Sequence, residues 1–224
     1  MLDAFVFDAY GTLFDVHSIT ALAETLAPRQ GAALSQIWRT KQVEYTWLQS
    51  LMATPDRPRE DFASITAHAL DYAVAALVAP VDGGARMQLL AAYRALAPFP
   101  DAARTLERLA PRRRAILSNG TLGMLEPLVA TSGLAPLLDA VWSVDAVDVY
   151  KPHPRVYQLA VDALQLAPAR IGFVSANGWD AAGAKAFGFT TFWINRAGAP
   201  VERHGAAPDY VVGSLAEVAA ITLA

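Results

Sequence analysis

From residue 98 to residue 194, the sequence alternates between short apolar runs and longer stretches with the three- and four-residue spacing of helices. A further apolar run, residues 2–7, lies at the start of the chain. The expected strands are 2–7, 114–118, 140–144, 170–174 and 190–194, and the expected helices are 101–109, 122–131, 154–164 and 179–187. Alternation of this kind is typical of a parallel sheet with helices on both faces. The predicted fold class is therefore α/β with a doubly wound parallel sheet.

Residues 16–97 interrupt this alternation, because they show helical periodicity without a strand-like run. Apolar side chains of two expected helices should form the core of this region: Leu34, Trp38, Tyr45, Leu48 and Met52 in one, and Phe62, Ile65, Ala69 and Tyr72 in the other. Pro55 and Pro58 separate these helices, and Pro98 marks the return to the α/β part. We therefore predict an α/β core domain, residues 1–15 and 98–224, with an inserted helical domain, residues 16–97.

Composition excludes several classes of function. Of the 224 residues, 54% are hydrophobic and 17% charged, which is enough for a large core. No apolar stretch reaches the roughly 20 residues of a membrane span, and a net charge of -3 gives no basic face for nucleic acid. The chain has no cysteine, and its histidines (His17, His68, His153 and His204) lack metal-ligand spacing. The glycines match no nucleotide-binding motif. The first residues lack a basic, cleavable leader, so a cytoplasmic location is expected.

Four clusters of polar side chains follow four apolar runs, each of which is expected to be a strand of the sheet. They are Asp8 with Thr12 after residues 5–7, Ser118 with Asn119 after 115–117, Lys151 after 147–150, and Ser175, Asn177 and Asp180 after 171–174. The carboxyl ends of parallel strands lie along one edge of a sheet, so these side chains should converge there. Asp8, a carboxylate that ends a buried strand, is a candidate nucleophile. Taken singly, Ser118-Asn119 also fits a turn with a helix cap, and Lys151 fits a surface turn.

The segment Phe7–Phe14 reads Phe-Asp-Ala-Tyr-Gly-Thr-Leu-Phe. It resembles the aspartyl-nucleophile signature of the haloacid dehalogenase superfamily, Asp-x-Asp-x-Thr, with Tyr10 in place of the second Asp. The order of the four polar clusters also matches the four motifs of that superfamily, over essentially the whole chain. Phosphatases of the superfamily use the second Asp as general acid, because an alkoxide leaving group needs a proton. A halide does not, so Asp8, Tyr10 and Thr12 together resemble the (S)-2-haloacid dehalogenases.

The fourth cluster differs from the phosphatase pattern in the same direction. Phosphatases of the superfamily place carboxylates there to hold Mg²⁺, which prefers oxygen ligands in octahedral array. Tyr10, Ser175 and Asn177 are neutral in this chain, so only Asp8 and Asp180 remain as acidic members. The pattern is similar to that of dehalogenases that work without a metal, and no metal or cofactor is expected. Lys151 would then supply the positive charge that keeps Asp8 ionised.

The resemblance implies a covalent mechanism. Asp8 would attack C2 of a 2-haloalkanoate from behind the halogen, and water would then hydrolyse the ester, giving an (R)-2-hydroxyacid with inversion. Asp180 and Lys151 are both plausible activators of the water, and the sequence does not decide between them. Ser175 and Asn177 would position this water and Asp180. Thr12 would support Asp8. Ser118, with backbone N–H groups near Tyr10 and Asn119, would bind the substrate carboxylate.

The resemblance also assigns residues around the substrate. Arg39 matches the residue that family members aim at the departing halide, although an arginine in such a helix is otherwise most simply a solvated surface residue. Tyr157 matches an active-site tyrosine of the family, and its simpler interpretation is a buried core residue. An apolar wall around the alkyl group is expected from Tyr10, Val43, Phe62 and Trp179.

Two competing interpretations share the fold. A magnesium-dependent phosphohydrolase would need an acid that Tyr10 does not readily supply and a carboxylate cage that Asn177 weakens. A degenerate member used only for binding would be natural if Asp8 or Lys151 had been lost, and both are present. The expected partners are therefore a small 2-haloalkanoate and a halide ion. The family habit also implies a homodimer.

Overall fold

The structure is a computed structural model that describes residues 1–203 and 205–223. Within these residues, six parallel strands form one sheet in the order β3-β2-β1-β4-β5-β6. The strands are β1 (Ala4–Phe7), β2 (Arg113–Ser118), β3 (Ala140–Ser143), β4 (Ile171–Ser175), β5 (Thr190–Ile194) and β6 (Tyr210–Val212). The predicted α/β fold with a doubly wound parallel sheet is confirmed.

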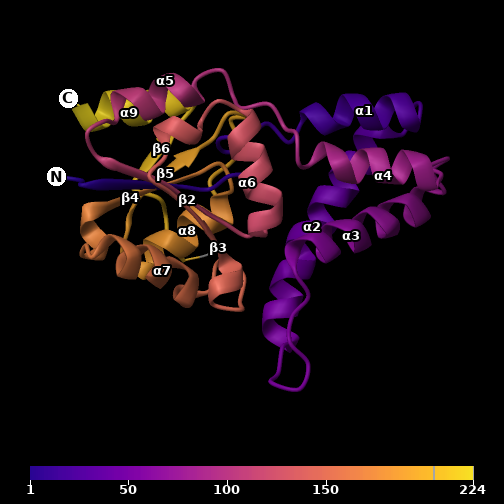
Figure 1. Cartoon of the computed structure of the whole chain (residues 1–224), viewed down its shortest axis with the longest axis horizontal. Coiled ribbons are helices and arrows are strands. Elements are labelled where there is room, and N and C mark those ends of the chain that lie inside the picture. Colours follow the sequence, from indigo (N-terminus) through magenta and orange to yellow (C-terminus); the bar gives the residue numbers. More distant parts are fainter. Residues whose placement is uncertain (204, 224) are drawn as a thin grey trace.

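Helices cover both faces of this sheet. In Figure 1, α5 packs with α9 above the sheet, and α7 packs with α8 below it. The bounds of the helices in this part are α5 (Ala102–Arg108), α6 (Leu122–Thr131), α7 (Pro154–Leu164), α8 (Gly178–Phe187) and α9 (Leu215–Leu223). Phe5, Phe7, Phe173 and Phe192 are fully buried between these layers. Removing such aromatic surface from water is the main force that holds the layers together.

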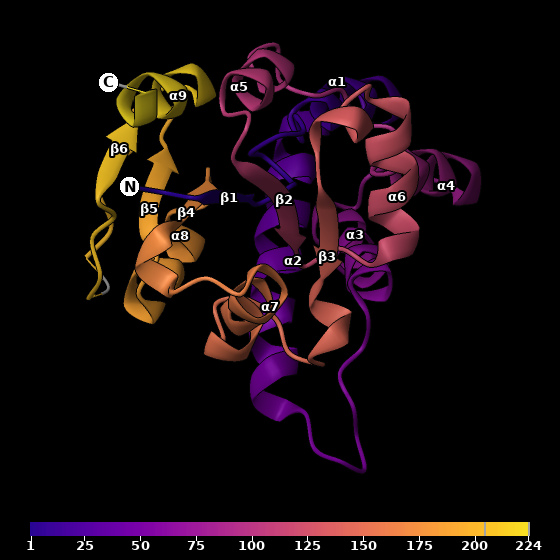
Figure 2. The ribbon, with the colours of Figure 1, turned by 60° about the vertical axis from the view of Figure 1, so that its left-hand side comes forward.

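The order of the strands places a site at the middle of the sheet. β1 lies between β2 and β4, and the chain builds β2 and β3 on one side of β1 before it returns to build β4, β5 and β6 on the other (Figure 2). Open α/β sheets bind their ligands at the carboxyl ends of the strands where this order reverses. Asp8 directly follows β1, and its N–H donates to the carbonyl of Val174 in β4 at 2.9 Å.

Two expectations about this part were wrong or incomplete. Residues 147–150 are not a strand, because β3 ends at Ser143 and the 3-10 helix η2 (Val144–Ala146) follows it. Asp148 has a φ of 56°, a left-handed conformation that cannot continue a strand. β6 and α9 were not predicted. A strand of three residues is at the lower limit of strand length, so it gives little periodic signal.

Residues 16–97, here called the helical block, form helices that lie beside the sheet rather than over its faces (Figure 1). The helices are α1 (Ser18–Leu26), α2 (Gly31–Met52), α3 (Phe62–Leu77) and α4 (Gly83–Ala92). Asp61 caps α3 by accepting from the N–H of Ser64, and Asp82 caps α4 by accepting from that of Ala85. Such caps satisfy N–H groups that the first helical turn leaves free. Among the described residues, no helix combines the length and apolarity that crossing a membrane requires.

The predicted core of the helical block is only partly correct. Leu34, Trp38, Phe62, Ile65 and Ala69 are buried as expected. However, the side chains farther along both helices are not: Leu48 is 40% exposed, Met52 50% and Tyr72 45%. The far end of α2, which carries Leu48 and Met52, extends beyond the sheet in Figure 1. Tyr72 lies on α3, where the ammonium of Lys41 is 4.8 Å from the centre of its ring. Periodicity alone does not indicate whether a partner is present along the whole helix.

Gly172 lies against the side chains of Phe5 and Leu2, so a substitution at this position measures how tightly they pack on the sheet. A Cβ at this position in β4 would lie 2.8 Å from Cε1 of Phe5 and 3.1 Å from Cδ1 of Leu2. Gly172→Ala should therefore lower the free energy of unfolding by about 1–3 kcal/mol, because overpacking forces these side chains to shift. Urea denaturation followed by circular dichroism measures this change.

The matched control is Gly123→Ala in α6, where the nearest atom, Oγ1 of Thr121, lies at 3.9 Å. Alanine is the better helix former, so this variant should gain up to ~1 kcal/mol. Equal effects of the two substitutions would contradict the tight packing of Phe5 on β4.

Candidate active site

Asp8 is almost fully buried at the end of β1, and three side chains contact its carboxylate. Oδ2 accepts hydrogen bonds from Oγ1 of Thr12 at 3.1 Å and from Nδ2 of Asn177 at 2.9 Å. Oδ1 accepts from Nζ of Lys151 at 3.2 Å. Thr12 itself is anchored to the next strand end, since its Oγ1 accepts from the N–H of Ala176 at 2.8 Å. Thr12 and Asn177 thus fix the orientation of the Asp8 carboxylate.

The buried ammonium group of Lys151 lies between two carboxylates, those of Asp8 and Asp180. Its Nζ donates to Oδ2 of Asp180 at 2.9 Å as well as to Asp8, and it lies 4.9 Å from the centre of the Phe173 ring. Burial alone would lower the pKa of Lys151, but Asp180 and Asp8 outweigh this effect and raise it above its ordinary value. The lysine therefore remains charged, although it is only 1% exposed. The interpretation of Lys151 as a surface turn is thereby excluded.

Asp180 is fully buried in the first turn of α8 and has a second polar partner. Oη of Tyr157, from α7, donates to Oδ1 of Asp180 at 2.9 Å. Burial raises the pKa of Asp180 above its ordinary value, while Lys151 and Tyr157 act in the opposite direction. Burial also raises the pKa of Tyr157, so this hydroxyl keeps its proton and acts as a donor. The predicted tyrosine is therefore buried, and its polar end contacts the site.

Arg39 reaches the sheet edge from α2 in the helical block. Its Nη2 donates to Oδ1 of Asn177 at 3.2 Å, and the amide of Asn177 in turn donates to Asp8. Asn177 precedes α8 and is itself held by Oγ of Ser175, which accepts from its N–H at 3.1 Å. Arg39 is therefore not a freely solvated surface residue. The amide of Asn177 links a cation of the helical block to the carboxylate of the sheet.

Gln42 was not among the predicted site residues, although it holds Arg39 in place. Its Oε1 accepts from Nη1 of Arg39 at 2.7 Å, and its Nε2 donates to Oγ1 of Thr66 in α3 at 2.7 Å. Gln42 is fully buried. Its position three residues after Arg39 places both on one helix face, and this spacing next to the apolar Trp38 is the signal that the sequence contained.

Ser118 and Asn119 end β2 as predicted, and their side chains make local contacts. Oγ of Ser118 accepts from the N–H of Gly120 at 3.1 Å, which is the turn expected from the sequence. Oδ1 of Asn119 accepts from the N–H of Lys151 at 3.0 Å. Asn119 therefore fixes the backbone of Lys151, a contact that the sequence did not indicate.

A small cavity of about 20 Å³ lies between the helical block and the sheet edge. Its lining consists of Asp8, Tyr10, Arg39, Val43, Thr46, Phe62, Ser118, Asn119, Asn177 and Trp179. The predicted apolar wall is thus present, with the Tyr10 and Phe62 rings 5.7 Å apart. Thr12, Lys151, Tyr157, Ser175 and Asp180 lie behind this lining. A larger cavity of about 380 Å³ also borders Arg39, but none of its described lining residues is a carboxylate, so the smaller cavity is the candidate site.

The donor set does not suit a divalent metal ion. Within residues 1–203 and 205–223, no group of three or more His, Asp and Glu side chains is arranged to hold one, while His204 lies outside the described residues. The Lys151 ammonium occupies the position between Asp8 and Asp180 where a cation would bridge them. The arrangement therefore presents an oriented carboxylate to a small cavity, with Lys151 behind it and Arg39 across the cavity from the sheet.

Comparisons with known proteins agree with this arrangement. A sequence model of the haloacid dehalogenase-like hydrolases matches residues 2–188. The chain is 46% identical to (S)-2-haloacid dehalogenase of Pseudomonas sp. strain YL, over 95% of this chain and 90% of that protein. The structure matches L-2-haloacid dehalogenase RSc1362 with a TM-score of 0.96 and 43% identity, over 100% and 99% of the two chains.

A structure of L-2-haloacid dehalogenase from Xanthobacter autotrophicus with chloropropionic acid covalently bound also matches, with a TM-score of 0.90 and 42% identity over 100% and 99% of the chains. The class of this protein is thus a haloacid dehalogenase-like hydrolase. Within that class, the chain belongs to the family of the (S)-2-haloacid dehalogenases.

Tyr157→Phe should test the electrostatic coupling behind the cavity. A hydrogen bond to the charged form of a carboxyl stabilises that form and lowers its pKa, so removing the hydroxyl should raise the pKa of Asp180 further. A carboxyl-detected NMR titration measures this shift. The loss of a buried donor should also lower the free energy of unfolding by about 1–3 kcal/mol.

Tyr210→Phe is the matched control, because Tyr210 lies on β6 and is 40% exposed. It should leave the Asp180 titration unchanged. An unchanged titration of Asp180 in Tyr157→Phe as well would show that the tyrosine does not act on this carboxyl.

Proposed function

We propose that the protein hydrolyses the carbon-halogen bond of (S)-2-haloalkanoic acids and forms (R)-2-hydroxyalkanoic acids. The observation that carries this proposal is the Asp8 carboxylate, which faces the cavity while Lys151 contacts it from behind and Arg39 stands on the opposite side. A neighbouring cation keeps a carboxylate nucleophile ionised. A second cation, on the side where the halide leaves, stabilises the departing anion. The names of the relatives support the same substrate class: three are (S)-2-haloacid dehalogenases at 42–46% identity, and one is haloacetate dehalogenase H-2 at 40%.

In the first step, an Asp8 carboxylate oxygen attacks C2 of the substrate from the side opposite the halogen. The new C–O bond forms as the carbon-halogen bond breaks, and the halide leaves with the bonding electron pair. The product of this step is an ester between Asp8 and the 2-carbon, as in other covalent mechanisms with carboxylate nucleophiles. Attack from behind inverts C2. The covalently bound chloropropionic acid in the Xanthobacter enzyme supports an intermediate of this type.

Arg39 stabilises the halide as its charge develops. A guanidinium aimed at the leaving group binds the transition state more strongly than the neutral carbon-halogen bond of the ground state. Gln42 and Asn177 each take a hydrogen bond from one of its terminal nitrogens, which holds the plane of the fork in one orientation. No proton is required by the leaving halide, and this agrees with Tyr10 in the position where phosphatases have an acid.

In the second step, water gives a proton to a base and attacks the carbonyl carbon of the Asp8 ester. The bond from this carbon to the C2 oxygen then breaks, and that oxygen takes the proton from the protonated base, so the 2-hydroxyacid leaves with C2 untouched and Asp8 regains its carboxyl group. We assign Asp180 as the base. Lys151 stays protonated between its two carboxylates, so it has no free lone pair, whereas burial raises the pKa of Asp180 and strengthens it as a base. Ser175 and Asn177 position the water at the end of β4. Lys151 then balances the negative charge that develops on the ester oxygen.

The substrate carboxylate is assigned to the end of β2. Ser118 lines the cavity there, and the start of α6 (Leu122–Thr131) turns backbone N–H groups towards the same end. The N–H groups near Tyr10 and Asn119 complete this anion site in our proposal. The alkyl group of the substrate would then contact Tyr10, Val43, Phe62 and Trp179, and the small volume of the cavity favours short chains.

The reaction is proposed to need no metal ion. Lys151 already bridges Asp8 and Asp180, so its ammonium takes the role that Mg²⁺ has in related phosphatases. The alternative, a magnesium-dependent phosphohydrolase, requires a general acid. Burial raises the pKa of Tyr10 and so opposes this role, and its Oη has no hydrogen-bond partner among the described residues.

The domain organisation and assembly are proposed on structural grounds. Residues 16–97 would act as a cap domain that closes the cavity over the α/β core of residues 1–15 and 98–224.

Leu48, Leu51 and Met52 form an exposed apolar surface at the end of α2, and an apolar surface of this kind supports a homodimer. The reaction of a small diffusible acid also suits a cytoplasmic location.

Halide release from the two enantiomers of 2-chloropropionate, after exhaustive treatment with EDTA, tests the reaction and its metal independence together. The (S)-acid should release chloride at an undiminished rate and give (R)-lactate, whereas the (R)-acid should not react. Asp8→Asn is the control, because it keeps the shape of the side chain and removes the charge. Chloride release that disappears with chelation and returns with Mg²⁺ would overturn the metal independence, whereas Mg²⁺-dependent hydrolysis of a phosphate ester without chloride release would favour the phosphohydrolase.

A single turnover in H₂¹⁸O, with enzyme in excess over substrate, locates the intermediate. Water attacks the ester at the Asp8 carboxyl carbon, so the label should enter Asp8 and not the lactate. Mass spectrometry of the peptide that contains Asp8 measures this, and the peptide with Asp180 serves as the unlabelled control. Label found in the lactate after the first turnover would show direct attack by water on C2.

A further inference from the structure

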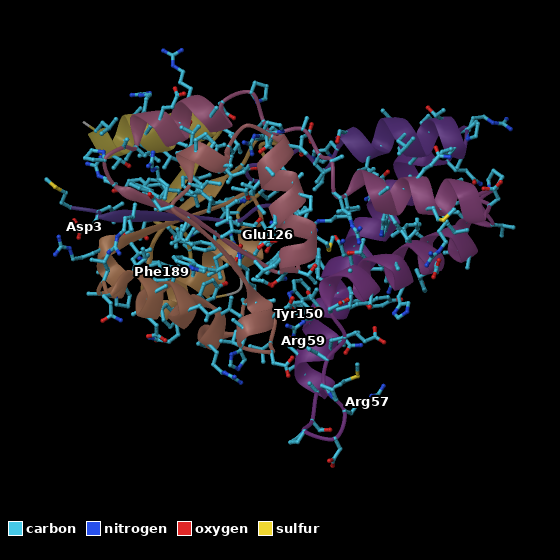
Figure 3. The ribbon with its side chains drawn as sticks, in the orientation of Figure 1. Asp3, Arg57, Arg59, Glu126, Tyr150 and Phe189 are labelled. Atoms are coloured by element: carbon cyan, nitrogen blue, oxygen red, sulfur yellow. The ribbon has the colours of Figure 1, made fainter. Side chains whose placement is uncertain are left out.

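Arg59 connects the helical block to the core at a distance from the cavity. It lies in the loop between α2 and α3, yet only 3% of its side chain is exposed. Figure 3 shows Arg59 beside Tyr150 of the core, while Arg57 lies further towards the tip of the helical block. Buried arginines are uncommon unless they are paired, so this side chain requires an explanation.

The guanidinium of Arg59 makes three contacts with the core segment 145–150. Nη2 pairs with Oδ1 of Asp145 at 2.7 Å, and Nε lies 3.3 Å from Oδ1 of Asp148. The guanidinium carbon lies 4.2 Å from the centre of the Tyr150 ring, which it covers. A planar, delocalised cation can stack on an aromatic ring and pair with carboxylates at its edge at the same time, whereas a lysine ammonium cannot.

Tyr150, which Arg59 covers, is itself held by further contacts with the helical block. Tyr150 is fully buried, and its Oη donates to the carbonyl of Glu60 at 2.7 Å. Its backbone N–H donates to Oγ of Ser50 at 2.9 Å. Its ring is also 6.4 Å from that of Phe62. Residues 50–62 of the helical block therefore enclose residues 145–150 of the core from several directions.

Both segments lead directly into the candidate site. Lys151, which contacts Asp8 and Asp180, is the next residue after Tyr150. Phe62, which lines the cavity, begins α3 shortly after Arg59. A displacement of either segment would thus move a residue of the site, and displacements of about 1 Å are enough to slow a reaction by up to ~10²-fold.

We propose that Arg59 is a positioning residue that clasps residues 145–150 of the core to the helical block and so places both Lys151 and Phe62 for the reaction. This inference rests on the proposed dehalogenase function for its kinetic part. Its structural part, the ordering of residues 145–151 by Arg59, is independent of any activity. A role in overall stability alone would leave the turnover of the folded enzyme unchanged.

The test compares Arg59→Met with Arg57→Gln in the full-length protein. Arg57 lies in the same loop and is exposed, so it is the matched control. Hydrogen-deuterium exchange should be faster across residues 145–151 in Arg59→Met than in the wild type, and unchanged in Arg57→Gln. Chloride release from (S)-2-chloropropionate should fall by about 10- to 100-fold in kcat, and KM should rise as Phe62 loses its fixed position.

Arg59→Lys should recover little of the loss, because it keeps the charge but not the stacked fork. If Arg59→Met does not fold, Asp145→Asn and Asp148→Asn weaken its ion pairs more gently and should change the exchange in the same direction. A folded Arg59→Met variant with a lower melting temperature but wild-type exchange at 145–151 and wild-type kcat would overturn the proposal. Wild-type protein that releases no chloride would refute the dehalogenase function, while the exchange experiment would still test the clasp.

Discussion

The buried ammonium of Lys151 lies between the carboxylates of Asp8 and Asp180, and the remainder of the site is arranged around this triad. Burying an ion costs several kcal/mol unless partners and hydrogen bonds compensate for the lost water. The two carboxylates compensate the ammonium, and Thr12 and Tyr157 supply hydrogen bonds to the carboxylates. Because one cation is shared by two carboxylates, the triad keeps a net negative charge, and this suits the nucleophilic role proposed for Asp8.

The sheet and the helical block contribute different residues to the surroundings of this triad. The sheet provides fixed strand ends that hold Asp8 and Asn177, while the helical block provides Arg39 and two residues of the apolar wall, Val43 and Phe62. Contacts between the parts are polar as well as apolar: Arg39 reaches Asn177, and Arg59 reaches Asp145. Polar contacts depend on direction and distance, so they define one position of the helical block beside the sheet. A purely apolar contact would permit more positions.

Much of the site could be predicted because strand ends in a parallel sheet lie along one edge. Asp8, Ser118 and Asn177 occupy the positions that this rule assigns to them. Lys151 also lies beside Asp8, as predicted. The prediction assumed that residues 147–150 are a strand ending at Lys151, but these residues are not a strand. Gln42 and Arg59 were missed, because their importance depends on partners that are far away in sequence, Thr66 and Asp145.

The sequence by itself determined the fold class and the family, and it indicated the residues proposed to carry the chemistry, because periodicity and short motifs are local properties of the chain. Only the tertiary structure decided which charges meet. It showed that Lys151 contacts two carboxylates, that Asn177 joins Arg39 to Asp8, and that Arg59 is buried against Tyr150. These contacts join segments that are distant in sequence, and electrostatic interactions depend on separation in space, which no local pattern records.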